Sequence, residues 1–267
     1  MFHNTNVVAY AEHWLGNLTI DLVRYAIFTI AVWLVIWVLL RQRLRHRKLR
    51  EATPPHRQLL TEFAVSLRTV AIFSTVGLVM FALERVGVMR GPEIARYWGW
   101  GWSAASPLLM VLAHDTYFYF THRAMHDPRL FRHIHRRHHR SHNPSPFSAY
   151  SFDITEGIVQ AAFVPIWMLL VPTSWPVIGF FMIHQIARNT IGHCGYELFP
   201  ANADGRPLFG FMTTVTHHDL HHSEGRWNYG LYFSWWDRWM GTQHPEYLAH
   251  FATASGRRVE LQGTPNA

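Results

Sequence analysis

Histidine is concentrated in two stretches of this chain, where its spacing is regular. Of 20 histidines in 267 residues, eight lie between residues 114 and 142 and six between 184 and 222. Residues 122–126 read HRAMH, 135–139 read HRRHH and 218–222 read HDLHH. On a helix, positions i, i+3 and i+4 share one face. We therefore expect each box to present its imidazoles together.

A metal site is the chemistry that this pattern predicts. A lone HxxxH pair is usually two unrelated histidines, whereas three boxes with a further His193 between them indicate shared ligation. Nine imidazoles are too many for one ion and fit two. Imidazole binds zinc, copper, iron and nickel, so the spacing does not name the metal. The single cysteine, Cys194, excludes a cluster held by several thiolates. The expected ligands are His122, His126, His135, His138, His139, His193, His218, His221 and His222.

Carboxylates near the boxes are candidates for supporting roles. Asp115 lies seven residues before His122, about two helical turns away on the same face. Its carboxylate is expected either to accept the free N–H of a ligating imidazole or to make a polar contact between helices. Glu156 and Asp153 are weaker candidates for the first role. Asp219 is expected to form a salt bridge or to support a ligand, not to bind metal itself.

Four further histidines stay open at this stage. His142 and His217 flank the boxes and are expected to be solvated or to support ligands. His114 and His184 lie near the ends of apolar stretches, where either a buried polar contact or a place in the site is possible. The sequence does not decide whether any of them joins the metal centre.

The elements that carry these residues are apolar. Apolar residues make up 49% of the chain and charged residues 15%, against a usual charged share of about 25%. The run 22–40 is long enough to span a bilayer. The basic cluster at 41–50 follows it and places its end on the cytoplasmic side. The net charge of +7 accompanies no nucleic-acid-binding module, so no nucleic-acid partner is expected.

Further apolar stretches complete the expected topology. Residues 63–83 and 102–120 have the length of spans, and 158–186 reads as a hairpin interrupted by Pro172. The prediction is an all-α integral membrane protein with about four transmembrane helices and a cytoplasmic helical cap that carries the di-metal site. The expected division is 1–101 for the N-terminal membrane helices, 102–245 for the catalytic domain and 246–267 for a C-terminal tail.

The boxes and their surroundings resemble the fatty acid hydroxylase and sterol desaturase superfamily, and sterol desaturase-like members most. The resemblance covers roughly residues 110–245, and its motifs are specific in combination. The segments that carry it are Asp115–His126, Leu130-Phe131 leading into His135–His139, Gly192–Glu197, His217–His222, Asn228-Tyr229-Gly230 and Tyr232–Thr242.

The resemblance implies a membrane oxidoreductase that hydroxylates or desaturates a sterol-like or fatty-acyl lipid. It implies two iron ions, dioxygen as co-substrate, and a separate ferredoxin- or cytochrome b5-type electron donor. Zinc is a possible substitute for iron in purified protein. Some relatives carry HxxxH where this chain reads Asn189-Thr190-Ile191-Gly192-His193. Asn189 is thus expected to be a weak ligand, to hold a water, or to leave a coordination position open.

Two other classes of protein are compatible with a histidine-rich membrane chain. A metal transporter would place its polar ligands near mid-membrane, whereas these boxes fall outside the apolar runs. A metallohydrolase acting on lipid usually mixes carboxylates into its ligand set. The expected location is a multi-pass membrane protein, in the cell (inner) membrane if the source is bacterial, with the boxes cytoplasmic.

Overall fold

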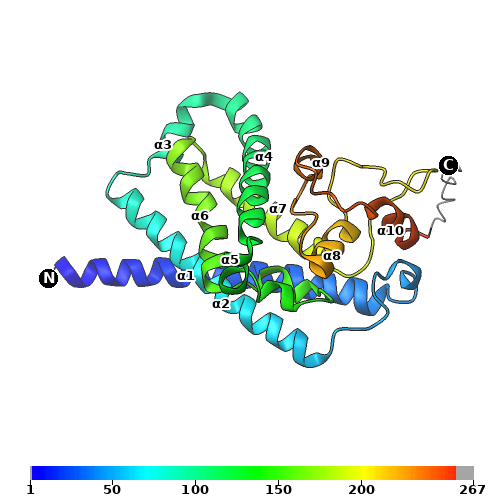
Figure 1. Ribbon diagram of the computed structural model, residues 1–267. Coiled ribbons are helices and arrows are strands. Elements are labelled where there is room, and N and C mark those ends of the chain that lie inside the picture. Colours follow the sequence, from blue (N-terminus) through cyan, green and yellow to red (C-terminus); the bar gives the residue numbers. More distant parts are fainter. Residues whose placement is uncertain (1, 257–267) are drawn as a thin grey trace, which may run out of the picture.

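The computed structural model describes residues 2–256, which are folded into helices and loops without a β-strand in that part of the chain (Figure 1). The prediction of an all-helical fold is therefore confirmed. The long helices are α1 (Phe2–Val32), α2 (His56–Arg85), α4 (Gly99–Met125), α6 (Ile154–Leu170) and α7 (Trp175–Gly192). The short ones are α3 (Gly91–Ala95), α5 (Pro128–Ile134), α8 (Val215–Glu224), α9 (Trp235–Trp239) and α10 (Tyr247–Ala254).

Two helices are long and apolar enough to cross a membrane. The first is the continuous helix Val7–Leu39, in which α1 passes into a π-helical stretch, Trp33–Leu39. It begins well before the expected span at residue 22. The second is α2. Among the described residues, α4 and α7 do not meet the same criteria of length and composition, and α6 is shorter. The arrangement with four spans therefore stays a prediction.

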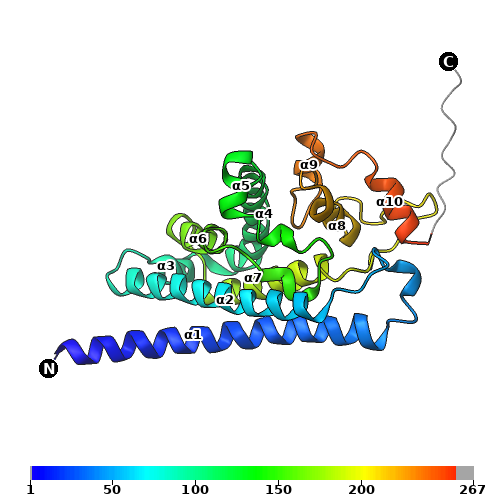
Figure 2. The ribbon, with the colours of Figure 1, turned by 60° about the horizontal axis from the view of Figure 1, so that its bottom comes forward.

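The C-terminal helices gather at one end of the helical bundle. α1 and α2 run side by side, and α8, α9 and α10 lie together near the end of α1 (Figure 2). Main-chain hydrogen bonds join the segment after α1 to the turn after α7. Leu49 N donates to Gly195 O at 3.1 Å, and Glu197 N donates to Arg47 O at 2.9 Å. The basic segment is thus attached to the chain that follows His193.

Arg50 of the basic cluster forms a salt bridge with Asp219 in the last histidine box. Arg50 Nε and Nη2 donate to the two carboxylate oxygens of Asp219 at 2.9 and 3.1 Å. A fork-shaped pair of this kind fixes direction as well as distance. The expected salt bridge of Asp219 is confirmed, and it connects the segment after the helix Val7–Leu39 to α8.

Local sequence explains the sharp turn at the end of α7. Gly195 has a φ of +75°, a backbone conformation that favours glycine. A Cβ at this position would lie 2.9 Å from Cζ2 of Trp37. The Trp37 indole N–H donates to Cys194 O at 2.9 Å, and Cys194 itself is fully buried, as expected of a small apolar side chain. The close packing of α1 on this turn fixes the course of the chain next to His193.

The predicted domain boundaries stay predictions. The expected catalytic domain would begin at residue 102, inside α4. The predicted tail begins with α10, which packs through Tyr247 and Phe251 on Leu220 of α8. Residues 257–267 of that tail lie outside the described part of the chain.

Candidate metal centre

The structure brings all nine candidate ligands together in two groups of buried or nearly buried imidazoles, each able to hold a metal ion. Within a group, one nitrogen of every ring lies within 4.8 Å of the others. The first group contains His122, His126, His135, His139 and His221. The second group contains His138, His193, His218 and His222.

The two HxxHH boxes are divided between the groups, which the sequence did not predict. His135 and His139 belong to the first group and His138 to the second. In the last box, His218 and His222 belong to the second group, whereas His221 belongs to the first. The expectation that each box presents all its imidazoles together was wrong for the two HxxHH boxes, whereas His122 and His126 of the HxxxH box do lie in one group. α5 ends at Ile134, and His138–Arg140 forms a 3₁₀ turn, so residues 135–139 have no single helix face.

Distances between ring nitrogens fit bound ions. In the second group, Nε2 of His218 lies 3.0 Å from Nε2 of His193, and Nε2 of His222 lies 3.3 and 3.1 Å from these two. Three ring nitrogens cannot satisfy one another by hydrogen bonds, because a protonated ring nitrogen only donates and an unprotonated one only accepts. Nitrogens that bind one ion at about 2.1 Å lie roughly 3.0–3.4 Å apart. The donor set therefore fits a metal ion in each group.

Outer contacts turn several rings so that Nε2 points inward. The Nδ1–H of His122 donates to Tyr229 O at 2.8 Å, and that of His221 donates to Trp227 O at 2.6 Å. His193 Nδ1–H donates to Asn189 O at 2.8 Å. Such contacts hold the proton on Nδ1 and leave the Nε2 lone pair free for a metal. The Nε2 of His221 is buried and has no hydrogen-bond partner.

Low pKa values favour the neutral form of these rings, which ligation requires. Burial and the neighbouring imidazoles hold the pKa of His138, His218 and His222 well below its usual range. Burial and the neighbouring imidazoles also lower the pKa of His135 and His221 in the first group.

A buried carboxylate supports the first group. Glu156, in the first turn of α6, places Oε1 2.7 Å from Nδ1 of His135, and both side chains are 1% exposed. A carboxylate behind a ligating imidazole fixes its orientation and raises its basicity. Glu156, one of the two weaker candidates from the sequence, thus makes the contact with a ligating imidazole that was one of the two roles expected of Asp115. Asp153, the other candidate, pairs with Arg137 instead.

Asp115 connects α4 to the C-terminal segment. Its carboxylate accepts the N–H groups of Tyr232 and Phe233 at 2.8 and 3.2 Å and the indole N–H of Trp235 at 2.9 Å. It is fully buried and contacts none of the nine histidines. Of its two expected roles, the structure shows the polar contact between helices.

Asn189 lies beside the second group, but its amide nitrogen bonds to a main-chain oxygen and not to an imidazole. Nδ2 donates to Ala149 O at 2.6 Å, and the main-chain oxygen accepts from His193. The side chain is 5% exposed. The first group has five imidazoles and the second has four, so Asn189 lies next to the group with fewer donors.

The remaining open histidines lie outside both groups. His142 is exposed. His217 is fully buried, with Nε2 3.4 Å from Asp237 Oδ2. His114 Nδ1 shares a hydrogen bond of 3.0 Å with the Tyr232 hydroxyl, and His184 packs against the same ring.

Sequence reasoning missed the main-chain oxygens that orient His122 and His221. They belong to Tyr229 and Trp227, in the loop after α8. No side-chain type signals a carbonyl contact. The one available hint was that the Asn228-Tyr229-Gly230 segment matched the family pattern without an assigned role. A further histidine outside both groups, His244, is 5% exposed and shares a hydrogen bond of 2.8 Å with Glu224.

Comparison with known proteins identifies the class. The model of the fatty acid hydroxylase family matches residues 107–242, and the chain belongs to this family. That region contains all nine histidines, so the family assignment and the two groups rest on the same part of the chain.

Several curated relatives of the chain are named as sterol enzymes. A delta(7)-sterol 5(6)-desaturase of Gibberella zeae is 30% identical over 54% of this chain and 43% of its own length. Methylsterol monooxygenase 1 of Rattus norvegicus is 30% identical over 54% of this chain and 48% of its own. Cholesterol 25-hydroxylase of Mus musculus is 29% identical over 57% and 51%. The chain thus spans about half the length of these relatives. No solved structure matches it.

Proposed function

We propose that this protein is a membrane-bound oxidoreductase with two iron ions that uses dioxygen and external electrons to hydroxylate or desaturate a lipid, sterol-like or fatty-acyl. The observation that carries the proposal is the pair of adjacent imidazole groups, which share residues of the same two boxes. Relatives of the same family are named as sterol desaturase, methylsterol monooxygenase and cholesterol hydroxylase. The apolar helix Val7–Leu39 and α2 support a membrane setting.

The protein's own residues supply position and exclusion of water. Iron, when bound, supplies the activation of dioxygen that no amino-acid side chain provides. Eight of the nine imidazoles are buried, so the centre is shielded from bulk solvent. Tyr229 O, Trp227 O and Glu156 hold three of the rings in the direction that ligation needs. Hydroxylation and desaturation would differ in how the substrate C–H bond is placed.

Lipid analysis tests the reaction directly. Cells with and without the protein are compared by lipid mass spectrometry, and one lipid class is expected to shift by about +16 or −2 mass units. These values correspond to roughly one oxygen gained or two hydrogens lost. The purified iron-loaded protein should consume dioxygen only with a reductant and that lipid. Lipid hydrolysis without dioxygen uptake would instead identify a metallohydrolase, and metal uptake by vesicles a transporter.

The electron donor is proposed to dock beside His126. This histidine is the one ligand of the nine that is partly exposed, and it lines an open groove with Arg123 and Tyr229. The segments that follow His126 and α8 in the sequence carry further exposed arginines, namely Arg129, Arg132, Arg136, Arg140 and Arg226. A positive rim favours a donor with an acidic surface, because complementary charge raises the rate of encounter.

Charge reversal at this rim tests the docking site. Arg123→Glu combined with Arg226→Glu is expected to lower kcat/KM for the donor about tenfold at low salt. High salt should reduce the difference, because it screens the attraction in the wild type. Arg96→Glu, an exposed position on the segment before α4, is the matched control. Equal donor kinetics for the double variant and the control would place the donor elsewhere.

We propose that the protein is a multi-pass membrane protein, in the inner membrane if the source is bacterial, with this arginine rim on the cytoplasmic side.

A further inference from the structure

A cavity of about 340 Å³ lies between α1, α2, α4, α6 and α7, and none of the nine histidines lines it. Most of its wall is apolar, including Phe73, Met80, Phe163, Ile178 and Phe181. Cavities that bind small molecules have about 300–1,000 Å³ and a mostly apolar lining with a few polar groups. The size and lining fit a lipid.

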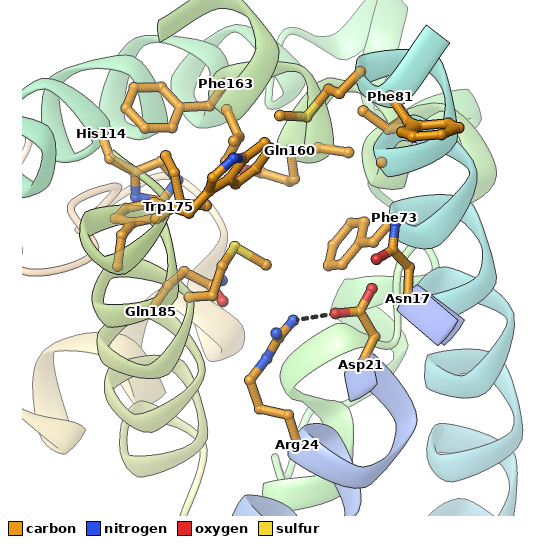
Figure 3. A pocket seen from close by; sticks show the side chains of 18 of the residues that line it. Asn17, Asp21, Arg24, Phe73, Phe81, His114, Gln160, Phe163, Trp175 and Gln185 are labelled. Carbon is orange, nitrogen blue, oxygen red and sulfur yellow. Dashed lines mark ion pairs between the residues drawn. The ribbon is translucent and has the colours of Figure 1, made fainter. Parts of the chain in front are cut away.

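An ion pair from α1 faces this cavity. Arg24 Nη2 lies 2.8 Å from Asp21 Oδ1, and the two side chains are 13% and 14% exposed. Both point into the space between α7 and α2 (Figure 3). Ser74 of α2 donates to the second carboxylate oxygen of Asp21 at 2.9 Å. Ionisable groups within an apolar helix are costly and usually functional, and this pair lies outside the region matched by the family model.

Two hydrogen-bond donors in the lining have no acceptor. Gln160 Nε2 and Arg24 Nε are buried and make no hydrogen bond. The acceptor oxygen of Gln185, another lining residue, is already used by the Tyr150 hydroxyl at 2.5 Å. Glu84 and Asn17 also line the cavity and carry acceptor oxygens, but both unpaired atoms are donors. A ligand that satisfies them must supply an acceptor.

The charge of the cavity decides which kind of acceptor group a ligand can place there. Asp21 neutralises Arg24, so the cavity presents no net positive charge from this pair. A ligand carboxylate would lie near the Asp21 carboxylate and would lose its hydration without a free cation in return. The oxygen of an alcohol or a carbonyl accepts hydrogen bonds without that cost.

Two helices connect the cavity to the metal centre. His114 lines the cavity eight residues before His122 on α4, and Gln185 lines it eight residues before His193 on α7. Eight residues of helix rise about 12 Å. His114 and Gln185 therefore lie about 12 Å along their helices from His122 and His193. A lipid in the cavity contacts the same two helices that carry ligands of both imidazole groups.

We infer that this cavity binds an uncharged lipid through an alcohol or carbonyl oxygen, and that free fatty acid anions are poor ligands. The inference rests on the proposed function only in treating the bound lipid as the substrate. The chemical class follows from the unpaired donors and the neutral ion pair.

Binding measurements test this inference without metal or turnover. Native mass spectrometry of the purified full-length chain counts bound 1-octadecanol and bound stearate, two probes with the same chain length. The wild type is expected to bind octadecanol at least about tenfold more tightly than stearate, and Gln160→Leu to lower octadecanol affinity about tenfold. Gln42→Leu, an exposed glutamine after the first helix, is the matched control. Equal binding of the two probes, or an unchanged Gln160→Leu variant, overturns the inference.

A second variant should reverse the preference. Asp21→Asn keeps an oxygen for Ser74 but leaves Arg24 without its carboxylate, so stearate affinity is expected to rise about tenfold or more. Failure of stearate to gain affinity in a folded variant contradicts the role of charge balance. These outcomes are separate from the proposed function: alcohol binding without any lipid oxidation would refute the oxidoreductase alone, and lipid oxidation without this binding pattern would refute the cavity alone.

Discussion

Replacing His138 or His221 by alanine is expected to remove one of two bound metal ions and to abolish activity. His138 belongs to the group of four imidazoles and His221 to the group of five. Loss of a buried ligand removes a donor that no solvent molecule can readily replace, because both rings are almost inaccessible. The effect should exceed the roughly 10–100-fold that removal of an outer partner costs. Metal analysis of the purified variants should give about one ion per chain, against two for the wild type.

His133→Ala is the matched control for these two variants. His133 is exposed on α5, two residues before His135, and belongs to neither group. Its variant should keep both ions and full activity. The metal assignment would be wrong if both ligand variants retained two ions, and the proposed reaction would be wrong if both retained full activity.

Replacing Glu156 by leucine is expected to have the second largest effect. The carboxylate lies 2.7 Å from Nδ1 of His135 and is buried with it. Without this acceptor, the ring loses its fixed orientation and some of its basicity as a ligand. Affinity for one of the two ions should fall about 10–100-fold. Competition with a chelator measures this loss, and Glu156→Gln should restore part of the affinity because the amide keeps an oxygen of similar position beside Nδ1 of His135.

A second buried carboxylate separates metal binding from stability. Glu62 on α2 accepts from Gln58 at 2.7 Å and is bonded to Ser145 at 2.5 Å, and it contacts no imidazole of either group. Glu62→Leu should lower stability by leaving these donors unpaired but should not lower metal affinity in the folded protein. If Glu62→Leu and Glu156→Leu weakened metal binding equally, the contact with His135 would have no special role.

Sequence spacing predicted which histidines lie together but not how they are divided. The i, i+4 pairs His122/His126, His135/His139 and His218/His222 each lie in one group, because that spacing survives even where the helix is short. The middle histidine of each HxxHH box, His138 or His221, belongs to the group opposite to that of its two neighbours. In residues 135–139 the backbone leaves the helix, whereas His221 lies within α8, where its ring points about 100° away from that of His222.

Contacts over long sequence distances were beyond pattern reasoning. Asp115 bonds to the backbone of residues more than 100 positions later, and its acceptor role there depends on main-chain N–H groups. The polar groups of the cavity come from α1, α2, α4, α6 and α7, whose relative placement no periodicity encodes. Hydropathy located the apolar helices, and the exposed hydrophobic side chains of the helix Val7–Leu39, such as Ile20, Ile27 and Leu39, are consistent with a lipid environment.

The crossed use of the two HxxHH boxes has a thermodynamic consequence. Since the segments 135–139 and 218–222 each supply both groups, an ion bound in one group orders backbone that the other group also needs. The conformational entropy of these two segments is then lost when the first ion binds. The second ion binds at a smaller entropic cost, so binding of the two ions is cooperative. Metal titration of the stripped protein should be steeper than for independent sites, and by reciprocity, removal of either ion should weaken retention of the other.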